Sequence, residues 1–265
     1  ERRYFASGRD AGLEPVVFEV AGLKFGLAIC EDAWFDEPAR SARAAGAQVL
    51  CVPNASPSHL GKVDERESRM GDRARDVGMP VLYAHLTGGQ DEVVFDGASF
   101  AVDATGHVRA RAPMFAESLL MLDVSAGEVA GSVTEVPCIE SQAWSALVTG
   151  VHDYIGKNGF PGALIGLSGG VDSALVLAIA VDALGPDRVR AVMMPSAYTA
   201  DISWIDARAM ARGLGVRYDE ISIEPMFSSF KESLASEFAG LPADATEENI
   251  QARIRGTLLM ALSNK

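Results

Sequence analysis

Short apolar runs and stretches of helical amphipathic spacing alternate along the first third of the chain, which predicts alternating strands and helices. The expected elements are, in order, strands over 16–20 and 23–30, a helix over 38–47, a strand over 48–53, a helix over 62–77 and a strand over 80–84. From residue 92 to 108 the pattern changes to short extended runs with Gly97 and Gly106 at turns, and a strand over 119–124 follows. We expect residues 1–124 to form a layered α/β domain that ends in antiparallel strands.

Residues 125–140 are rich in Gly, Ser, Val and Glu and show little helical period, which predicts a linker to a second domain over residues 141–265. The expected elements of that domain are a helix over 141–157, a strand over 163–165, a helix over 173–184, a strand over 188–194, a helix over 205–214 and a strand over 217–223. This βαβαβ order predicts a parallel, doubly wound sheet with its ligand at the carboxyl ends of the strands. Thr246 is expected to cap a last, amphipathic helix.

Composition excludes several classes of protein. The 265 residues are 48% apolar, enough for two hydrophobic cores, and a formal charge of −13 leaves no basic surface for a nucleic acid backbone. Cys30, Cys51 and Cys138 are too few and too dispersed for a disulfide framework or a Cys-x-x-Cys metal site. No apolar run approaches the ~20 residues of a membrane span. We expect a cytoplasmic protein with neither nucleic acid nor a membrane as partner.

In the second domain an apolar run breaks into small residues and then restarts as a helix. This segment consists of Gly166, Leu167, Ser168, Gly169, Gly170, Val171, Asp172 and Ser173. Small residues let the backbone approach an anion, and the following helix N-terminus favours negative charge, so we expect a phosphate site. The segment lacks the lysine of a Walker A loop and the spacing of a dinucleotide fingerprint. Asp172 is either a Mg²⁺ ligand or a carboxylate of the first helical turn, and Ser168 and Ser173 either contact phosphate or cap the helix.

Cys30 ends a predicted buried strand and is followed by Glu31, Asp32 and Trp34. From position alone this thiol is either an exposed nucleophile or a packed core cysteine, and both interpretations are open. The segments 28–34, 54–62 and 88–97 resemble, in this order, the nitrilase-type carbon–nitrogen hydrolases, and the last two resemble their glutamine-using branch. The resemblance implies that residues 1–124 are the C-terminal part of a nitrilase-like α/β sandwich and that Cys30 is its nucleophile.

In that family the cysteine works with a glutamate and a lysine, since amide hydrolysis needs a thiolate, a base and a cation near the oxyanion. Residues 1–5 resemble the tail of the segment that follows the family's lysine, so both partners are expected before residue 1. The chain opens without Met and stops after a helical pattern, and we expect it to be an internal piece of a longer protein. Glu19 and Lys24 are expected to belong to a solvated hairpin instead.

The same resemblance implies that Ser56 and Lys62 contact the glutamine substrate, with Glu31 and Trp34 nearby. The alternatives are a turn residue before Pro57 for Ser56 and a surface charge at a helix start for Lys62. A papain-like pairing of Cys30 with His59 or His85 is the other chemistry open to these residues. We favour loop roles for both histidines.

The Gly-rich segment resembles the SGG-x-DS loop of the ATP pyrophosphatases. Together with the Met-Pro-Ser-x-Tyr-Thr run over 194–199 and the run over 248–255, the likeness narrows to the glutamine-dependent NAD synthetase family. It implies that the loop binds ATP, that Asp172 holds Mg²⁺, and that Asn249 and Arg253 contact deamido-NAD. The implied reaction is adenylylation of deamido-NAD and its amidation by ammonia from glutamine, in a homo-oligomeric ligase.

Two alternatives stay open beside this interpretation. The first is another glutamine amidotransferase of the ATP-pyrophosphatase class, although those enzymes carry their cysteine in a different motif. The second is a nucleotide-binding or assembly module, with the fragment itself inactive, because two members of the expected triad lie outside the chain.

Overall fold

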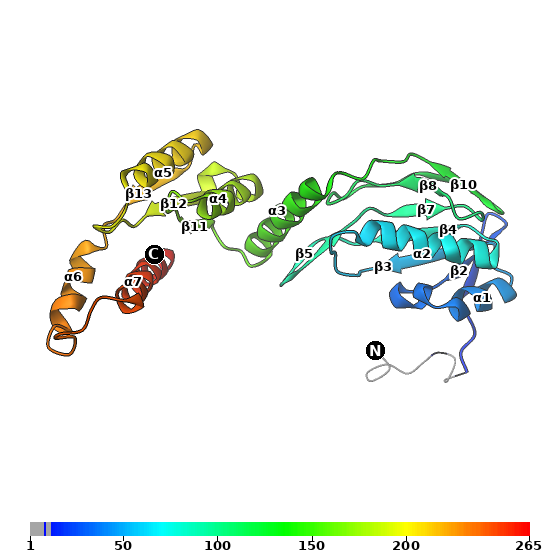
Figure 1. Cartoon of the computed structure of the whole chain (residues 1–265). Helices are drawn as coiled ribbons and strands as arrows, with labels where there is room; N and C mark the ends of the chain where they lie inside the picture. The colour runs from blue at the N-terminus through cyan, green and yellow to red at the C-terminus, as the bar shows by residue number, and fades with distance from the viewer. Residues whose placement is uncertain (1–7, 9–11) are drawn as a thin grey trace. The chain divides into compact units, whose positions relative to one another are not determined.

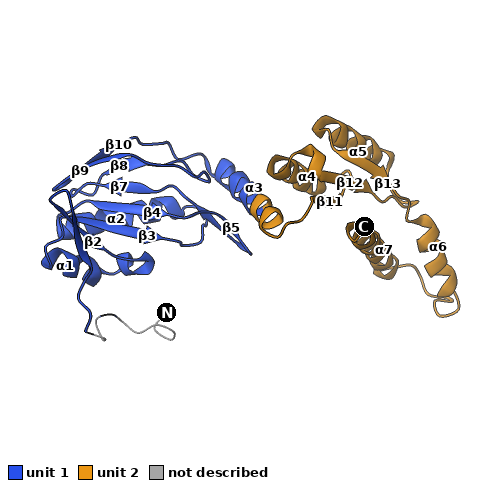
Figure 2. Ribbon diagram, turned by 180° about the vertical axis from the view of Figure 1, so that it is seen from behind, with its two compact units in different colours: residues 1–150 blue, residues 151–265 orange. Residues whose placement is uncertain are grey.

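The computed structural model describes residue 8 and residues 12–265, and the chain divides into two compact units, Glu1–Gly150 and Val151–Lys265 (Figures 1 and 2). The segment 1–5, compared above with the hydrolase family, lies outside the described residues. Within the described part of the chain, no helix has the length and apolar character needed to cross a membrane.

Unit 1 is built on a six-stranded mixed sheet. Its strands, in spatial order, are β1 (Val17–Val20), β2 (Leu23–Leu27), β3 (Val49–Asn54), β4 (Val81–His85), β7 (Phe100–Val102) and β8 (Val108–Arg111). The strands β2, β3 and β4 are parallel, and the remaining pairs are antiparallel. The predicted α/β domain that finishes in antiparallel strands is therefore confirmed.

The first hairpin forms where the sequence predicted it, because Ala21 and Gly22 both adopt positive φ, 51° and 80°. Such a turn matches the twist of the flanking strands. Glu19 and Lys24 face each other across this hairpin and are exposed, as expected for a solvated pair.

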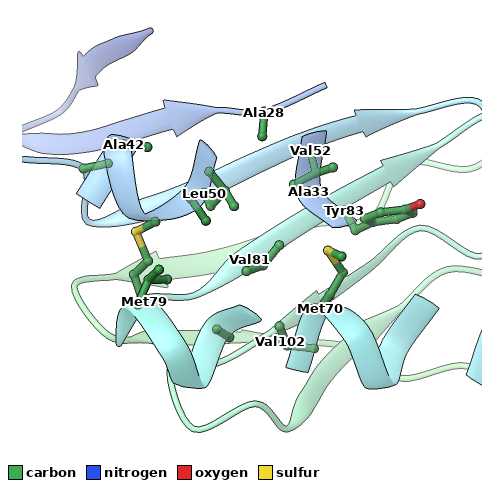
Figure 3. Packing of buried hydrophobic residues seen from close by; sticks show 14 of the residues in the cluster. Ala28, Ala33, Ala42, Leu50, Val52, Met70, Met79, Val81, Tyr83 and Val102 are labelled. Carbon is green, nitrogen blue, oxygen red and sulfur yellow. The ribbon is translucent and has the colours of Figure 1, made fainter. Parts of the chain in front are cut away.

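Two helices and one short 3₁₀ helix cover the sheet: α1 (Asp36–Ala44), α2 (Lys62–Val77) and η1 (Cys30–Trp34). Figure 3 shows the buried cluster between them, in which Leu50, Val81 and Val102 of the sheet face Met70 of α2. Gly26 of β2 permits the close approach of α1, because a Cβ at this position would lie 2.8 Å from the Cβ of Ala42.

Unit 1 also holds two small antiparallel pairs, β5 (Thr87–Gln90) with β6 (Val93–Asp96) and β9 (Leu122–Ser125) with β10 (Glu128–Gly131). The strand β10 lies in the segment 125–140, where the sequence indicated an irregular linker. Val129 of β10 is 5% exposed and packs against Ala101 and Ala110, and this burial accounts for the extra strand. The helix α3 (Ile139–Lys157) follows and carries the boundary between the units (Figure 2). Our domain boundaries stay a prediction.

Unit 2 has a parallel sheet in the order β11 (Ala163–Gly166), β12 (Val189–Met193) and β13 (Arg217–Glu220). Its helices are α4 (Val171–Leu184), α5 (Asp201–Leu214), α6 (Glu224–Ser233) and α7 (Ala245–Ser263), with the short η2 (Pro186–Arg188) before β12. Buried residues of α4 and α5 share one core with the odd-numbered positions of β12, and those of α6 and α7 share a second core with Val192. Helices thus cover both faces, which confirms the doubly wound fold.

The helix α7 is capped by Asp244, and the prediction that Thr246 caps it is wrong. The Asp244 carboxylate accepts a hydrogen bond from the backbone N–H of Thr246 at 2.8 Å. The carboxylate of Glu247 accepts from the backbone N–H of Asp244, also at 2.8 Å, which completes a capping box. The sequence offers two cap candidates two residues apart, and the first one takes the role.

Candidate active sites

Cys30 lies in a strained turn, and the prediction that a strand ends at Cys30 is wrong. The strand β2 ends at Leu27, the backbone N–H of Ala28 still donates to Cys51 at 3.0 Å, and the chain then turns away. Cys30 opens η1 with a φ of 50°. This left-handed conformation costs a non-glycine residue about 1–3 kcal/mol. A half-buried thiol in such a turn is not packed in the core, which favours the nucleophile interpretation, and this role of Cys30 stays a prediction.

The turn at Cys30 is held by a side chain of η1 and by a side chain of α2. The carboxylate of Asp32 accepts a hydrogen bond from the N–H of Ile29 at 3.1 Å. The guanidinium of Arg73, which is 8% exposed, donates to the carbonyl of Ala33 at 3.4 Å and pairs with Asp36. Contacts on both sides of Cys30 therefore fix the strained conformation.

The structure brings together Trp34 and Lys62, two of the residues for which glutamine contact was expected. Lys62 Nζ lies 4.3 Å from the centroid of the Trp34 ring and 2.9 Å from a carboxylate oxygen of Glu65. The guanidinium of Arg69 lies 4.5 Å from the same ring. Because its side chain is only 15% exposed and packs on an aromatic face, Lys62 is more than a surface charge. Glu31 is exposed in η1, and its contact with glutamine, like that of the others, stays a prediction.

Ser56 follows β3 in a tight local turn, in which its N–H donates to the side-chain oxygen of Asn54 at 2.8 Å. Its hydroxyl lies 3.4 Å from Nε2 of His85. The expected turn role of Ser56 and an active-site role are therefore compatible, since the turn aims the hydroxyl at a buried side chain.

Behind this loop lies a buried network of three side chains: Arg66 (2% exposed), His85 (8%) and Asp96 (1%). Arg66 of α2 forms an ion pair with Asp96 at the end of β6, and its Nη1 donates to His85 Nε2 at 2.8 Å. His85 Nε2 also lies 3.1 Å from the carbonyl oxygen of Ser56, and Nδ1 faces Asp96 Oδ1 at 3.5 Å, so both ring nitrogens lie against polar groups of the buried network or of the Ser56 loop.

This environment decides the role of His85. Burial and the charge of Arg66 lower the pKa of His85 to about 4, so its imidazole is neutral at physiological pH. Its Nε2 lies 2.8 Å from Arg66 Nη1 and 3.1 Å from the carbonyl oxygen of Ser56, and these neighbours occupy the nitrogen that a thiol would need as a base. His85 therefore serves the network instead of a papain-like pair. His59 donates to the carbonyl of Leu60 at 3.0 Å, which agrees with the expected loop role.

In unit 2 the Gly-rich segment forms an exposed loop between β11 and α4. Gly169 has a φ of 84°, and a Cβ there would lie 2.3 Å from the carbonyl oxygen of Ser203, so only glycine fits. Gly166 ends β11, Leu167 is buried, and Gly170 is the N-cap of α4, in which Val171 is the first residue. The loop thus places small residues directly before a helix N-terminus, as the phosphate-site prediction required.

Two hydroxyls organise this loop. Ser173 Oγ lies 3.0 Å from Ser168 Oγ, accepts a hydrogen bond from the N–H of Ser168 at 3.1 Å, and donates to the carbonyl of Gly170 at 3.0 Å. Ser168 Oγ accepts from the N–H of Gly170 at 3.2 Å. Neither hydroxyl caps α4, whose N-cap is Gly170 without a side-chain cap; the two serines instead hold the loop together, and their contact with phosphate stays a prediction.

Asp172 is exposed in the first turn of α4. Within the described residues, no group of three or more His, Cys, Asp or Glu side chains is placed to hold a metal ion. A single carboxylate fits Mg²⁺ that is bound largely by phosphate oxygens and water, which is the common arrangement of this ion with nucleotides.

The helix α7 meets the carboxyl ends of β11 and β12. Leu259 of α7 packs over Gly166, and Arg255 Nε donates to the carbonyl of Met194 at 3.0 Å. Asn249 and Arg253 lie on the exposed side of the same helix, one turn apart, and Arg253 Nη1 donates to the carbonyl of Asn249 at 3.4 Å. Both residues expected to contact deamido-NAD therefore belong to the helix that packs against Gly166, the first residue of the Gly-rich segment.

Comparisons with known proteins match the two parts of the chain to two different families. Residues 1–132 match the carbon-nitrogen hydrolase family, and residues 143–265 match the NAD synthase family. The solved structure of glutamine-dependent NAD+ synthetase from Acinetobacter baumannii in complex with ADP has a TM-score of 0.91 and 41% identity, covering 99% of this chain and 50% of that chain. A glutamine-dependent NAD(+) synthetase from Cytophaga hutchinsonii, with a TM-score of 0.74 and 19% identity over 94% of this chain and 48% of its own, shares the fold.

Curated relatives match along the whole sequence. The glutamine-dependent NAD(+) synthetase of Xylella fastidiosa is 46% identical over 270 residues, which cover 100% of this chain and 49% of the relative. That of Acinetobacter baylyi is 41% identical over 268 residues, again 100% of this chain and 49% of the relative. The chain spans about half the length of the curated relatives it matches. With both family matches in the same order and similarity from end to end, the chain belongs to the glutamine-dependent NAD(+) synthetase family.

Proposed function

We propose that the full-length protein converts deamido-NAD to NAD, with ATP as the activating substrate and glutamine as the nitrogen donor. The observation that carries this proposal is the presence, on one chain, of a strained cysteine turn in a carbon-nitrogen hydrolase unit and a glycine-rich loop in an NAD synthase unit. Another amidotransferase of the ATP-pyrophosphatase class is disfavoured, because the cysteine lies in the hydrolase-type unit.

At the first site, Cys30 Sγ attacks the side-chain carbonyl carbon of glutamine, and the tetrahedral adduct collapses to a thioester with release of ammonia. Water then cleaves the thioester to glutamate and frees the thiol. Lys62 and Ser56 line the approach to Cys30 in this proposal, with Glu31 and Trp34 beside them. The left-handed turn serves the reaction by keeping the sulfur accessible while α2 holds the residues behind it.

At the second site, the nicotinate carboxylate of deamido-NAD attacks the α-phosphorus of ATP and pyrophosphate leaves. Ammonia then attacks the acyl adenylate, and AMP leaves as the amide forms. The loop from Gly166 to Ser173 holds the phosphates through its backbone and the N-terminus of α4, while Asn249 and Arg253 hold the dinucleotide. Asp172 would hold Mg²⁺, and the bound ion would neutralise charge on the departing pyrophosphate.

We include homo-oligomer formation and a cytoplasmic location in this proposal. The exposed apolar side chains Val171 (78%), Leu175 (50%) and Val176 (50%) on α4 support association with another copy. The three free cysteines of the described residues support a reducing compartment.

The direct test supplies the full-length protein with deamido-NAD, ATP, Mg²⁺ and glutamine labelled with ¹⁵N in the side-chain amide. We expect NAD that carries the label in its carboxamide, with one pyrophosphate and one glutamate for each NAD. Formation of pyrophosphate without NAD would contradict the ligase activity and would mean that the protein only cleaves ATP. Binding of ATP without pyrophosphate release would favour a nucleotide-binding module.

Replacement of Asp172 with asparagine tests the second site by itself. The amide cannot neutralise a cation, so we expect pyrophosphate release to fall by about two orders of magnitude, or about 2.7 kcal/mol of transition-state stabilisation. Glutamate release from glutamine should persist at Cys30. Asp182→Asn, near the other end of α4, is the matched control and should leave both reactions unchanged. Full ATP turnover in the Asp172 variant would exclude this carboxylate as the metal ligand.

A further inference from the structure

Buried polar atoms without a hydrogen-bond partner gather at one place in unit 1. Among the described residues they are Asn54 Nδ2, Tyr83 OH, His85 Nδ1 and Asp96 Oδ1. The last two atoms face each other at 3.5 Å and belong to the network of Arg66. The amide of Asn54 and the hydroxyl of Tyr83 remain, at 7% and 2% exposure of their residues. Such groups cost about 1–3 kcal/mol each when nothing pairs with them, so their presence calls for a partner.

Both groups lie on the face of the sheet that η1 and α2 cover. Tyr83 and His85 are two residues apart on β4, their rings stack at 6.0 Å, and Asn54 is the partner of His85 across β3 and β4. The Tyr83 ring belongs to the same buried cluster as Ala33 of η1. Figure 3 shows its hydroxyl pointing away from the apolar side chains of that cluster.

The surroundings of the Tyr83 hydroxyl are those of the Cys30 site. Burial raises its pKa to about 12, while Arg66 and Ser56 act in the opposite direction, and an ionised Cys30 adds to the increase. The Tyr83 ring also stacks on His85, whose Nε2 lies 3.4 Å from Ser56 Oγ, and shares a cluster with Ala33 of η1, so Tyr83 packs between the Ser56 loop and the short helix that begins at Cys30. The phenol stays neutral at physiological pH and both donates and accepts hydrogen bonds.

Together, the buried polar side chains around the Tyr83 hydroxyl carry no net charge. The charge of Arg66 is compensated by Asp96, His85 is neutral, and the unpaired groups are a phenol and an amide. A neutral ligand group that both donates and accepts hydrogen bonds would pair with the phenol and the amide. An ionised ligand group would meet no counter-charge there. The side-chain carboxamide of glutamine has this chemistry, and it is the end of the substrate that must reach Cys30.

We propose that Tyr83 is a substrate-binding residue of the glutaminase site, and that its hydroxyl, together with the amide of Asn54, binds the carboxamide of glutamine beside Cys30. This inference rests on the proposed function, because it assumes that glutamine is cleaved at Cys30. Tyr83 and Asn54 then recognise the carboxamide of glutamine and hold its carbonyl carbon within reach of the Cys30 thiol.

The test is Tyr83→Phe in the full-length protein, since this change removes only the hydroxyl. We expect kcat/KM for glutamate release to fall about tenfold, the value of one lost hydrogen bond at about 1.4 kcal/mol. NAD formation with added ammonia and the thermal unfolding midpoint should not fall, because the hydroxyl makes no structural hydrogen bond within the described residues. Tyr218→Phe in unit 2, whose hydroxyl donates to Met193 Sδ at 3.3 Å, is the control and should leave glutamate release unchanged.

The outcomes separate the inference from the function on which it rests. Unchanged kcat/KM for glutamine in Tyr83→Phe, with normal glutamate release by the unmodified protein, overturns the inference and means that the hydroxyl binds only water. An equal loss with glutamine and ammonia, together with a lower unfolding midpoint, also overturns it in favour of a structural role. Absence of glutamate release by the unmodified protein refutes the proposed function itself.

Discussion

Replacing Cys30 with alanine is expected to reduce glutamine-dependent NAD formation by at least about a thousandfold, because no other group replaces a covalent nucleophile. NAD formation with added ammonia should be retained, since free ammonia bypasses the first site. The compact units support this division, as Cys30 and the two residues that hold its turn, Asp32 and Arg73, belong to unit 1. Both rates are measured on the same preparation, with NAD as the readout.

The substitution also relieves no strain, because alanine at a φ of 50° carries the same penalty as cysteine. A Cys30→Gly variant is therefore the informative companion. It should be equally inactive with glutamine but at least as stable as the unmodified protein, since glycine adopts positive φ freely. Cys51→Ala, a change at a thiol in β3, is the matched control for cysteine removal and should keep glutamine use. Equal loss with glutamine and ammonia in Cys30→Ala would contradict two separate sites.

The order of strands and helices was predictable because it depends on local apolar periodicity. The helix over 62–77 and the hairpin around Ala21 and Gly22 illustrate this, since the determinants of each lie within the segment itself. The strand β10 was missed because its formation depends on a contact at a distance in the chain, the packing of Val129 on Ala101 and Ala110. A strand of four residues with one buried side chain leaves little local pattern.

The two loops that carry the chemistry were found through motifs, but the groups that support them were not. Cys30 and the Ser168 loop stand in short contiguous segments. In the sequence, Arg66 is one of many charged residues of α2. Only the fold shows that it contacts His85 and Asp96, which are 19 and 30 residues away. One signal was available: the cations at 62, 66, 69 and 73 recur at the spacing of a single helix face, which a fully solvated helix would not require.

Arg255 shows the same limit in unit 2. The sequence places it with Asn249 and Arg253 in one run, although its guanidinium turns inward to the carbonyl of Met194, 61 residues away. The burial of this side chain lowers the pKa of Arg255. The hydrogen bond of Arg255 to Met194 fixes α7, which carries the residues expected to contact deamido-NAD. Arg255 therefore has a structural role although it lies in a substrate motif.

Replacing Arg66 with methionine is expected to destabilise unit 1 by about 3–5 kcal/mol, because it leaves the Asp96 carboxylate buried without a counter-charge. His85 Nε2 also loses its contact with Arg66, although it keeps those with the carbonyl and the hydroxyl of Ser56. Hydrogen exchange of peptides from β4 and α2 in the full-length protein measures this change locally, without requiring the two units to unfold together.

Arg40→Met is the matched control, because Arg40 also forms a two-point ion pair, with Asp76 of α2, but at 58% exposure of its side chain. Its loss should cost far less than that of Arg66, since water screens an exposed pair and solvates the carboxylate that remains. The double variant Arg66→Met with Asp96→Asn removes the uncompensated charge, and should therefore regain part of the protection lost in the single variant. If Arg66→Met loses as little exchange protection as Arg40→Met, the buried network of Arg66, His85 and Asp96 does not stabilise the region behind Ser56. Ser56 is then positioned by its own turn with Asn54 alone.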